Sequence, residues 1–411
     1  MCRGFFRDLP VPKQPLPRVV VVLGLVSFFN DFASEMVTPL IPILLAAVLG
    51  AGPLALGMVE GLAEAIAAWF KLWSGRRSDL WGGRRKPFVF GGYLLSNIVR
   101  PLMGLATSWG MVAGLRSLDR VGKGLRTAPR DALVGDATPA VMRGRAYGFH
   151  RALDNGGAMA GALLAAACLA WTPLTLTQII LFSALPGVVG VALVAFFVRD
   201  MPAAVVPTSP AILPPLSWRQ VSPRLRPYLL ILGLFTLARA SETFVVLRGH
   251  ELQMTIPLLL LLWAAMSLAK ALAAWFGGHW SDRFGHRRLV LVNWVTHGAS
   301  FLLLACVQSP PMLWVAALVY GLFAGLGEGA ERALVGELSE LRSDNANEAA
   351  GPSQRGTSFG WYNLVLGVAA IPAGLLFGSV WQQFDAAAAF AFAALLAWLA
   401  AWLFYRRVLN T

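Results

Sequence analysis

The sequence predicts an all-α integral membrane protein whose twelve transmembrane helices form two six-helix bundles. Three observations predict this fold class. Hydrophobic residues make up 57% of the 411 residues, and charged residues make up only 13%. The apolar residues lie in long continuous segments, and the two halves of the chain resemble each other in sequence.

The composition excludes several classes of protein. A soluble protein typically carries about 25% charged residues. The mean hydropathy of +0.63 implies more apolar surface than a soluble domain of this length could bury. The formal net charge of +13 therefore does not indicate a nucleic-acid-binding or disordered protein. The cysteines Cys2, Cys168 and Cys306 are scattered, so neither a disulfide framework nor a metal site is expected.

Twelve segments are long and apolar enough to cross a membrane, which takes about 20 mostly apolar residues per helix. Their apolar runs are continuous rather than alternating, which excludes a transmembrane barrel. We expect the first segment to be retained in the mature protein, because its apolar run is too long for a signal peptide. The predicted helices cover 18–48, 54–74, 88–108, 110–130, 145–170, 174–198, 227–248, 255–277, 288–308, 312–331, 356–379 and 385–405.

Most of the 34 basic residues fall on one side of the predicted membrane. They lie in the N-terminal tail, after every second helix and at the C-terminus, whereas the opposite loops show only Arg248. Basic segments stay in the cytoplasm, so both termini are predicted to be cytoplasmic. The predicted divisions are a cytoplasmic tail (1–17), a first bundle (18–198), a proline-rich cytoplasmic linker (199–226), a second bundle (227–405) and a cytoplasmic tail (406–411).

An internal repeat relates the two predicted bundles. Ala33-Ser34-Glu35 recurs as Ala240-Ser241-Glu242, and the segment 132–136 recurs as 333–337 with glutamate in place of the final aspartate. Further matches follow the same order at offsets of 201 to 207 residues. A parallel repeat of this kind places the substrate site between the bundles near the membrane midplane, and rocking of the bundles alternates access to that site.

Similar glycine- and arginine-rich segments follow the second and the eighth predicted helix. They read Gly75-Arg76-Arg77-Ser78-Asp79-Leu80-Trp81-Gly82-Gly83-Arg84-Arg85-Lys86 and Gly278-His279-Trp280-Ser281-Asp282-Arg283-Phe284-Gly285-His286-Arg287-Arg288. Both resemble the G-x-x-x-D-R-x-G-R-R loop of the major facilitator superfamily, from which the first copy departs at Leu80. The resemblance implies that these loops brace the closed cytoplasmic side; the alternative is that they only set topology. The gating residues it implies are Gly75, Asp79, Arg84, Arg85, Gly278, Asp282, Arg283, Gly285 and Arg287.

The fourth predicted helix carries a second resemblance to the superfamily. Arg120 to Gly124 is similar to its R-x-x-Q-G signature, with Lys123 in place of glutamine. In proton-coupled members this arginine faces a protonatable carboxylate, and the resemblance transfers that role to Arg120, while Arg116 offers a competing register. The glycines of the antiporter signature of helix 5 are present at 156–161, but its proline is absent, which argues against a proton antiporter.

Ionisable residues inside the predicted helices mark the candidate site, because such residues are costly in a membrane and usually face the protein interior or a cavity. Asp31 and Glu35 are four residues apart and share one helix face. Neighbouring carboxylates in a low-dielectric cavity bind a proton more readily, so Asp31 and Glu35 are the predicted proton-coupling pair, with Arg120 adjusting their proton affinity. The predicted substrate-binding residues are Glu60, Glu64, Arg100, Arg116, Asp154, Arg239, Glu242 and Lys270.

Several alternatives remain open for these charges. Arg239 and Glu242 are three residues apart and can simply neutralise each other. Asp154 is expected near Lys270, because the fifth and eighth helices are neighbours in this superfamily. Any of the charges can also pair as structural contacts within a bundle. Separately, Pro39 and Pro42 are expected to kink the first helix.

The sequence therefore predicts a proton-coupled secondary active transporter of a small organic solute, a monomer in the inner (plasma) membrane. Export of a drug or metabolite is favoured, and uptake of an anionic solute is the alternative. A transport-inactive receptor on the same fold is the alternative of another class. The chain has no catalytic triad, no metal-ligand spacing and no phosphate-binding loop, so no enzymatic activity, metal or cofactor is expected.

Overall fold

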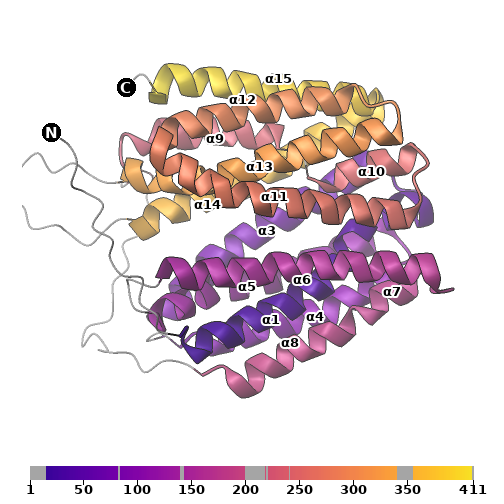
Figure 1. The fold of residues 1–411 in the computed structure, drawn as a ribbon, viewed down its shortest axis with the longest axis horizontal. Helices are drawn as coiled ribbons and strands as arrows, with labels where there is room; N and C mark the ends of the chain where they lie inside the picture. The colour runs from indigo at the N-terminus through magenta and orange to yellow at the C-terminus, as the bar shows by residue number, and fades with distance from the viewer. Residues whose placement is uncertain are drawn as a thin grey trace, which may run out of the picture.

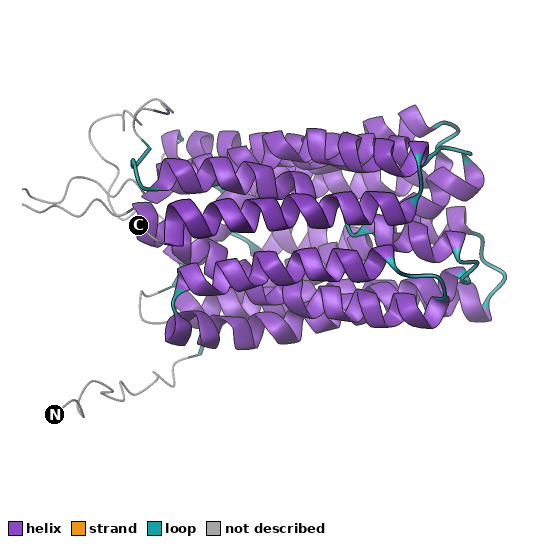
Figure 2. Ribbon diagram, turned by 90° about the horizontal axis from the view of Figure 1, so that it is seen from above, coloured by secondary structure: helices purple, strands orange, loops and turns teal. Residues whose placement is uncertain are grey.

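The structure is a computed structural model that describes residues 15–81, 84–138, 143–199, 218, 221–239, 241–339 and 355–409. Its helices run roughly parallel to the long axis (Figures 1 and 2), and they form two groups, one from each half of the chain (Figure 1). The start of α1 and the end of the last helix lie at the same end of the molecule (Figure 1). We call this end the terminal end and the opposite end the distal end.

The helices follow the chain in two consecutive sets. The first half comprises α1 (Arg18–Glu35), η1 (Thr38–Leu40), α2 (Ile41–Ile43), η2 (Leu44–Val48), α3 (Pro53–Leu80), α4 (Lys86–Leu102), η3 (Met103–Leu105), α5 (Trp109–Asp136), α6 (Arg143–Trp171), α7 (Leu176–Phe182) and α8 (Ala184–Phe197). The second half comprises α9 (Leu225–Ala238), α10 (Thr243–Glu251), α11 (Ile256–Phe284), α12 (His286–Ala305), α13 (Pro310–Ser339), α14 (Arg355–Gln383), α15 (Ala386–Phe404) and η6 (Tyr405–Leu409).

The predicted fold class is confirmed. Eleven helical segments among the described residues are long and apolar enough to cross a membrane. The remaining segment is α5, which has 28 residues but is less apolar because it carries charges such as Arg116, Asp119 and Arg120. It packs along α3 and α4, so it crosses the membrane with them and completes the predicted twelve.

Two of the crossing segments leave the helical conformation near their middle, and a third, predicted over 174–198, is divided into α7 and α8 at Ser183, whose backbone stays in the helical region. The predicted kink in the first is confirmed, because α1 ends at Glu35 and the chain continues through short 3-10, α and π turns around Pro39 and Pro42. The seventh segment, predicted as one helix over 227–248, is instead divided into α9 and α10. Arg239 leaves the helical region there, with φ −81° and ψ 84°, a local turn that hydropathy does not register.

Helices at the terminal end extend further than predicted. The helix α3 continues to Leu80 and α11 to Phe284, so much of each predicted loop, beginning at Gly75 and Gly278, is helical. A single residue, Gly285, then separates α11 from α12. Its φ of 88° lies in the region that glycine adopts without steric cost, which explains a glycine at that turn. The predicted linker 199–226 lies largely outside the described residues, and α9 begins at Leu225, one residue before the predicted end of the linker.

Clusters of buried apolar side chains distinguish the two ends of the molecule. At the distal end one cluster combines both halves, with Val37 from the first and Phe244 and Trp381 from the second. At the terminal end the halves have separate clusters, one around Tyr93 and one around Tyr228. The described residues are therefore packed across the two halves at the distal end and within each half at the terminal end.

Glycines bring α3 and α14, from opposite halves, into backbone contact at the distal end. A Cβ atom on Gly57 would overlap the carbonyl oxygen of Gly374, and a Cβ atom on Gly374 would overlap that of Gly57. Gly61 and Gly378 approach the facing backbone in the same way. Small residues allow close helix packing in membranes, and here they join the two halves.

This packing predicts that Gly57→Ala destabilises the protein. The added methyl group has no space against Gly374, and overpacking typically costs about 1–3 kcal/mol. The measurement is the apparent melting temperature of the purified protein in detergent. The control is Gly91→Ala on α4, where a Cβ atom meets nothing within 4 Å. Equal melting temperatures for the two variants would contradict the predicted contact.

Candidate functional site

The two helix breaks lie at the same repeated Ala-Ser-Glu motif. In the first half α1 ends at Glu35, and in the second half Glu242 directly precedes α10. Irregular backbone at membrane depth is tolerated where it is buried in protein or lines a cavity. The repeat therefore brings one glutamate from each half to an equivalent break, close to where the halves meet.

Both glutamates are bonded to α11. The indole Nε1 of Trp263 donates to Glu35 Oε2 at 2.8 Å, a contact that crosses from the second half to the first. The ammonium of Lys270 forms a short ion pair with Glu242, to which the hydroxyl of Tyr320 also donates at 3.5 Å. Trp263 and Lys270 are seven residues apart, which is about two helical turns, so they lie on one face of α11.

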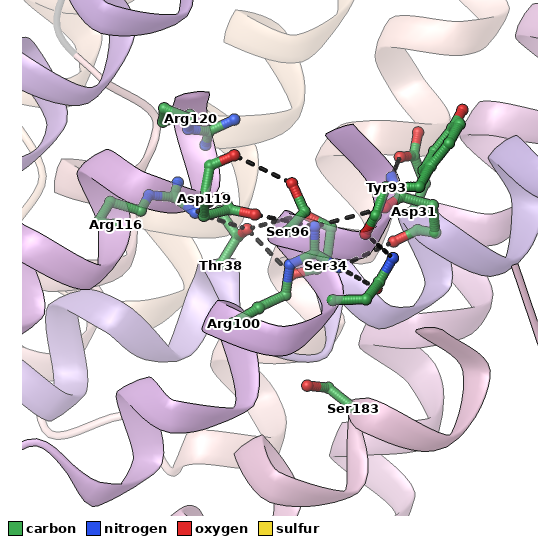
Figure 3. Close-up of polar contacts among 12 residues, drawn as sticks. Asp31, Ser34, Thr38, Tyr93, Ser96, Arg100, Arg116, Asp119, Arg120 and Ser183 are labelled. Atoms are coloured by element: carbon green, nitrogen blue, oxygen red, sulfur yellow. Dashed lines mark hydrogen bonds and ion pairs between the residues drawn. The ribbon is translucent and has the colours of Figure 1, made fainter. Parts of the chain in front are cut away.

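A buried polar cluster occupies the middle of the first half. Figure 3 shows Arg100 and Arg116 pointing toward Asp119. Arg100 Nη2 lies 3.1 Å from Asp119 Oδ1, and Arg116 Nη1 lies 3.8 Å from Asp119 Oδ2. Arg116 Nη2 also pairs with Glu60 Oε1 at 3.2 Å. The four side chains carry two positive and two negative charges, so the cluster is neutral.

Further hydrogen bonds tie this cluster to the first crossing segment. Arg100 Nη1 donates to the backbone oxygen of Asn30 at 3.3 Å, and Arg116 Nη1 donates to Thr38 Oγ1 at 3.5 Å. Both arginine side chains are only 1% exposed. This burial favours a structural role for Arg100, Arg116 and Glu60 over the predicted contact with substrate.

The predicted residues Asp31, Glu35 and Glu64 lie outside this neutral cluster. Asp31 and Glu35 are half-buried, and Asp31 accepts a hydrogen bond from Asn30 Nδ2 at 2.8 Å. The Glu64 side chain is 47% exposed, and its Oε1 lies 3.8 Å from Arg120 Nε. The carboxylate that Arg120 pairs with is therefore Glu64. Lys123, in place of the signature glutamine, is close enough for its charge to act on Glu64.

The second half contains a cluster that the sequence analysis missed. Arg239 Nη1 pairs with Glu331 Oε2 at 3.4 Å, a partner that differs from the Glu242 considered from the sequence. Glu331 also accepts hydrogen bonds from Trp294 Nε1 at 3.0 Å and from the Tyr362 hydroxyl at 3.2 Å. Its partners come from three other helices, and such a convergence has no signature in a single segment.

Asp154 lies in a different environment from the one predicted. Its Oδ2 is 3.5 Å from His150 Nδ1 and 3.9 Å from Arg151 Nη1, both on its own helix. Lys270 pairs with Glu242 instead. The expectation that Asp154 lies near Lys270 was based on the packing of their two helices. These helices, α6 and α11, do pack together. Asp154 nevertheless pairs with residues of its own helix.

The predicted gating residues lie at the terminal end, and the structure describes only some of their side chains. Arg85 Nη2 pairs with Asp136 Oδ2 at 3.1 Å, and Arg287 Nε pairs with Glu337 Oε1 at 3.1 Å. Asp136 and Glu337 are equivalent in the repeat, so both halves carry the same ion pair. Arg84 is exposed. The side chains of Asp79, Asp282 and Arg283 lie outside the described residues.

Cofactor ligands are not apparent in this region. Within the part of the chain that the structure describes, no group of three His, Cys, Asp or Glu side chains is arranged to hold a metal ion. The described charges instead form ion pairs and hydrogen bonds between helices. This arrangement is suited to binding a solute and to holding helices together.

The buried cluster predicts that Asp119→Asn strongly destabilises the protein. Loss of the carboxylate leaves Arg100 and Arg116 buried with too little compensating charge, and breaking a buried pair costs about 3–5 kcal/mol. The control is Asp131→Asn on the same helix, where the aspartate side chain is 46% exposed. Its partner Arg130 keeps a hydrogen bond to Ser27, so a smaller loss is expected. Apparent melting temperatures in detergent test this, and similar losses in both variants would argue against the cluster.

Comparisons with known proteins identify the family. A model described as Major Facilitator Superfamily matches residues 23–248 and 241–410. An uncharacterized MFS-type transporter of Methanocaldococcus jannaschii is 31% identical over 375 residues, covering 90% of each chain. An uncharacterized protein of Mycobacterium tuberculosis is 29% identical over 369 residues, covering 88% of this chain and 86% of that protein. A crystal structure of a mutant nucleoside transporter NupG shares the fold with a TM-score of 0.76 and 12% identity, covering 95% of this chain and 99% of that chain. The chain is thus a membrane transporter that belongs to the major facilitator superfamily.

Proposed function

We propose that the protein is a monomeric secondary active transporter that moves a small organic solute by alternating access and couples this movement to protons. The observation that carries the proposal is the bond between Glu35 and Trp263, which joins the two halves at a helix break. A carboxylate in this position is able both to bind a proton and to influence how the halves are held together.

The proposed orientation places the terminal end in the cytoplasm of the plasma (inner) membrane. Its support is the concentration of basic residues at that end, which follows the positive-inside rule. In this orientation the shared distal core closes the outer side. The separate cores of the two halves at the terminal end then correspond to a conformation that is open toward the cytoplasm.

Proton binding at Glu35 provides the proposed coupling step. A hydrogen bond to an ionised carboxylate is stronger than one to a neutral group, so unprotonated Glu35 holds Trp263 most firmly. A proton weakens this bond and releases the halves to rock toward the opposite conformation. Asp31 lies one turn earlier on the same helix face and is the second carboxylate of the proposed proton-coupling pair.

The proposed solute contacts are the partly exposed charges of both halves. Glu64 with Arg120 supplies one pair from the first half, and Glu242 with Lys270 supplies another from the second. Arg120 thereby contributes to the solute side rather than acting directly on Asp31. Charges of both signs suit a polar solute, with export favoured. The side chain of Arg239, 37% exposed, supports the second candidate, uptake of an anionic solute.

Gating at the terminal end is assigned to the paired arginine-rich segments. The ion pairs Arg85–Asp136 and Arg287–Glu337 hold the ends of neighbouring helices in each half. Equivalent contacts in both halves support a movement of each half as a unit. Asp79 and Asp282 keep the role that the superfamily resemblance implies, namely bracing this end when it closes.

The coupling proposal predicts that Glu35→Gln abolishes proton-driven transport. A solute is first selected as the compound that most raises the apparent melting temperature among drugs, sugars, nucleosides and organic acids. Its flux is then measured in proteoliposomes with an imposed pH gradient. Wild type follows the gradient, whereas Glu35→Gln loses the gradient dependence and keeps solute exchange, because an amide cannot take up the proton. Asp31→Asn is expected to reduce the gradient dependence.

The control variant is Glu251→Gln, whose carboxylate is 38% exposed and lies at the distal end of α10. It is expected to respond to the gradient as wild type does. Undiminished gradient-driven flux in both Glu35→Gln and Asp31→Asn would refute the coupling role. The sign of the gradient that drives accumulation separates export from uptake.

A further inference from the structure

A groove of about 470 Å³ lies at the terminal end of the second half, between the start of α9 and the end of α15 with η6. Figure 1 places α15 on the side of the second half that faces away from the first half. The groove is therefore separate from the proposed solute pathway between the halves. In a membrane-spanning protein this outer side faces lipid.

The groove combines two cations with an apolar wall. Arg226 and Arg407 lie along it together with Leu230, Ile231 and Leu403, and its remaining two lining residues are prolines. Leu230 is 68% exposed, which leaves an apolar surface for hydrocarbon to cover. The two guanidinium groups give the lining a positive charge, which favours an anion.

Hydrogen bonds to the backbone hold the Arg226 side chain and the segment that carries Arg407. Arg226 Nε donates to the backbone oxygen of Val221 at 3.0 Å, which holds its side chain beside the first turn of α9. Arg287 Nη1 donates to the backbone oxygen of Val408 at 2.9 Å, which fixes η6 and with it Arg407. The groove also lies at the N-terminal end of the 14-residue α9, where the helix dipole favours negative charge.

Exposed aromatic residues mark the membrane interface at the same level of the molecule. Trp402 and Tyr405, near the end of α15, are both exposed, and such residues are enriched at the headgroup level of membranes. The guanidinium of Arg406 lies 5.3 Å from the centre of the Trp402 ring. The two arginines of the groove thus lie at headgroup depth, with its leucines toward the hydrocarbon.

We propose that this groove binds one phospholipid with an anionic headgroup. Its phosphate lies between Arg226 and Arg407, and an acyl chain runs along Leu230 and Leu403. Phosphate accepts hydrogen bonds from guanidinium groups, and basic pockets between transmembrane helices are suited to anionic headgroups. The bound lipid would connect α9 with the C-terminal end of the chain.

The test is native mass spectrometry of the full chain after reconstitution with equal amounts of phosphatidylglycerol and phosphatidylcholine. Wild type is expected to retain one phosphatidylglycerol molecule in preference to phosphatidylcholine. The double variant Arg226→Gln/Arg407→Gln is expected to lose this preference by about 25-fold, because each basic residue near an anionic lipid contributes about a factor of five. The matched control Arg224→Gln/Arg406→Gln removes the same charge from adjacent positions outside the groove, and it is expected to keep the preference.

Two further measurements secure the assignment. Arg407→Gln alone keeps the Arg226–Val221 hydrogen bond and is expected to show an intermediate loss, which tests the site even if the double variant folds poorly. Inorganic phosphate and glycerol phosphate are expected not to displace the lipid, because they lack acyl chains. Equal lipid retention in wild type and both double variants would overturn the proposal. Displacement by free phosphate would overturn the assignment to a lipid.

Discussion

A charge inside a membrane must be neutralised by a partner, and the first half of this chain meets that constraint with one buried neutral cluster. Arg100, Arg116, Asp119 and Glu60 come from α3, α4 and α5, and their hydrogen bonds extend to the segment that begins with α1. The cluster neutralises the charges that α5 carries across the membrane, and its ion pairs hold α3 and α4 against α5. Asp31, Glu35 and Glu64 lie outside this cluster, and Glu35 contacts α11 of the second half.

The second half meets the same constraint with different charges. In the repeat, Glu64 is equivalent to Lys270 and Arg130 is equivalent to Glu331. At both positions the residue in one half carries the opposite charge to its equivalent in the other half. Glu331 is buried with Arg239, Trp294 and Tyr362 around it. The halves therefore share a shape but not an electrostatic pattern, and the region between them presents both signs of charge. In the proposed mechanism, this asymmetry allows one half to bind a proton while the other binds part of the solute.

Features that depend on composition or on local backbone chemistry could be predicted from the sequence. The twelve crossings follow from apolar length, the two bundles from the repeat, and the kink after Glu35 from nearby prolines. The break at Arg239 and its pairing with Glu331 depend on which helices face each other, and no single segment carries that information. The repeat of 132–136 as 333–337, extended by two residues toward the N-terminus, aligns Arg130 with Glu331 and would have singled out Glu331 as a charged position. The ends of α3 and α11 were placed too early, because hydropathy falls at the membrane surface while helical hydrogen bonding continues.

The central claim is that the protonation state of Glu35 sets how the two halves are held, and a distance measurement tests it most directly. Spin labels at Asp136→Cys and Glu337→Cys, in a background without Cys2, Cys168 and Cys306, report the separation of the halves at the terminal end by double electron–electron resonance. The account predicts long distances in alkaline buffer and a shift to short distances in acid. It also predicts short distances at both acidities in Glu35→Gln. A wild-type distribution that does not change with acidity, or an equally large acid shift in Glu35→Gln, would contradict it.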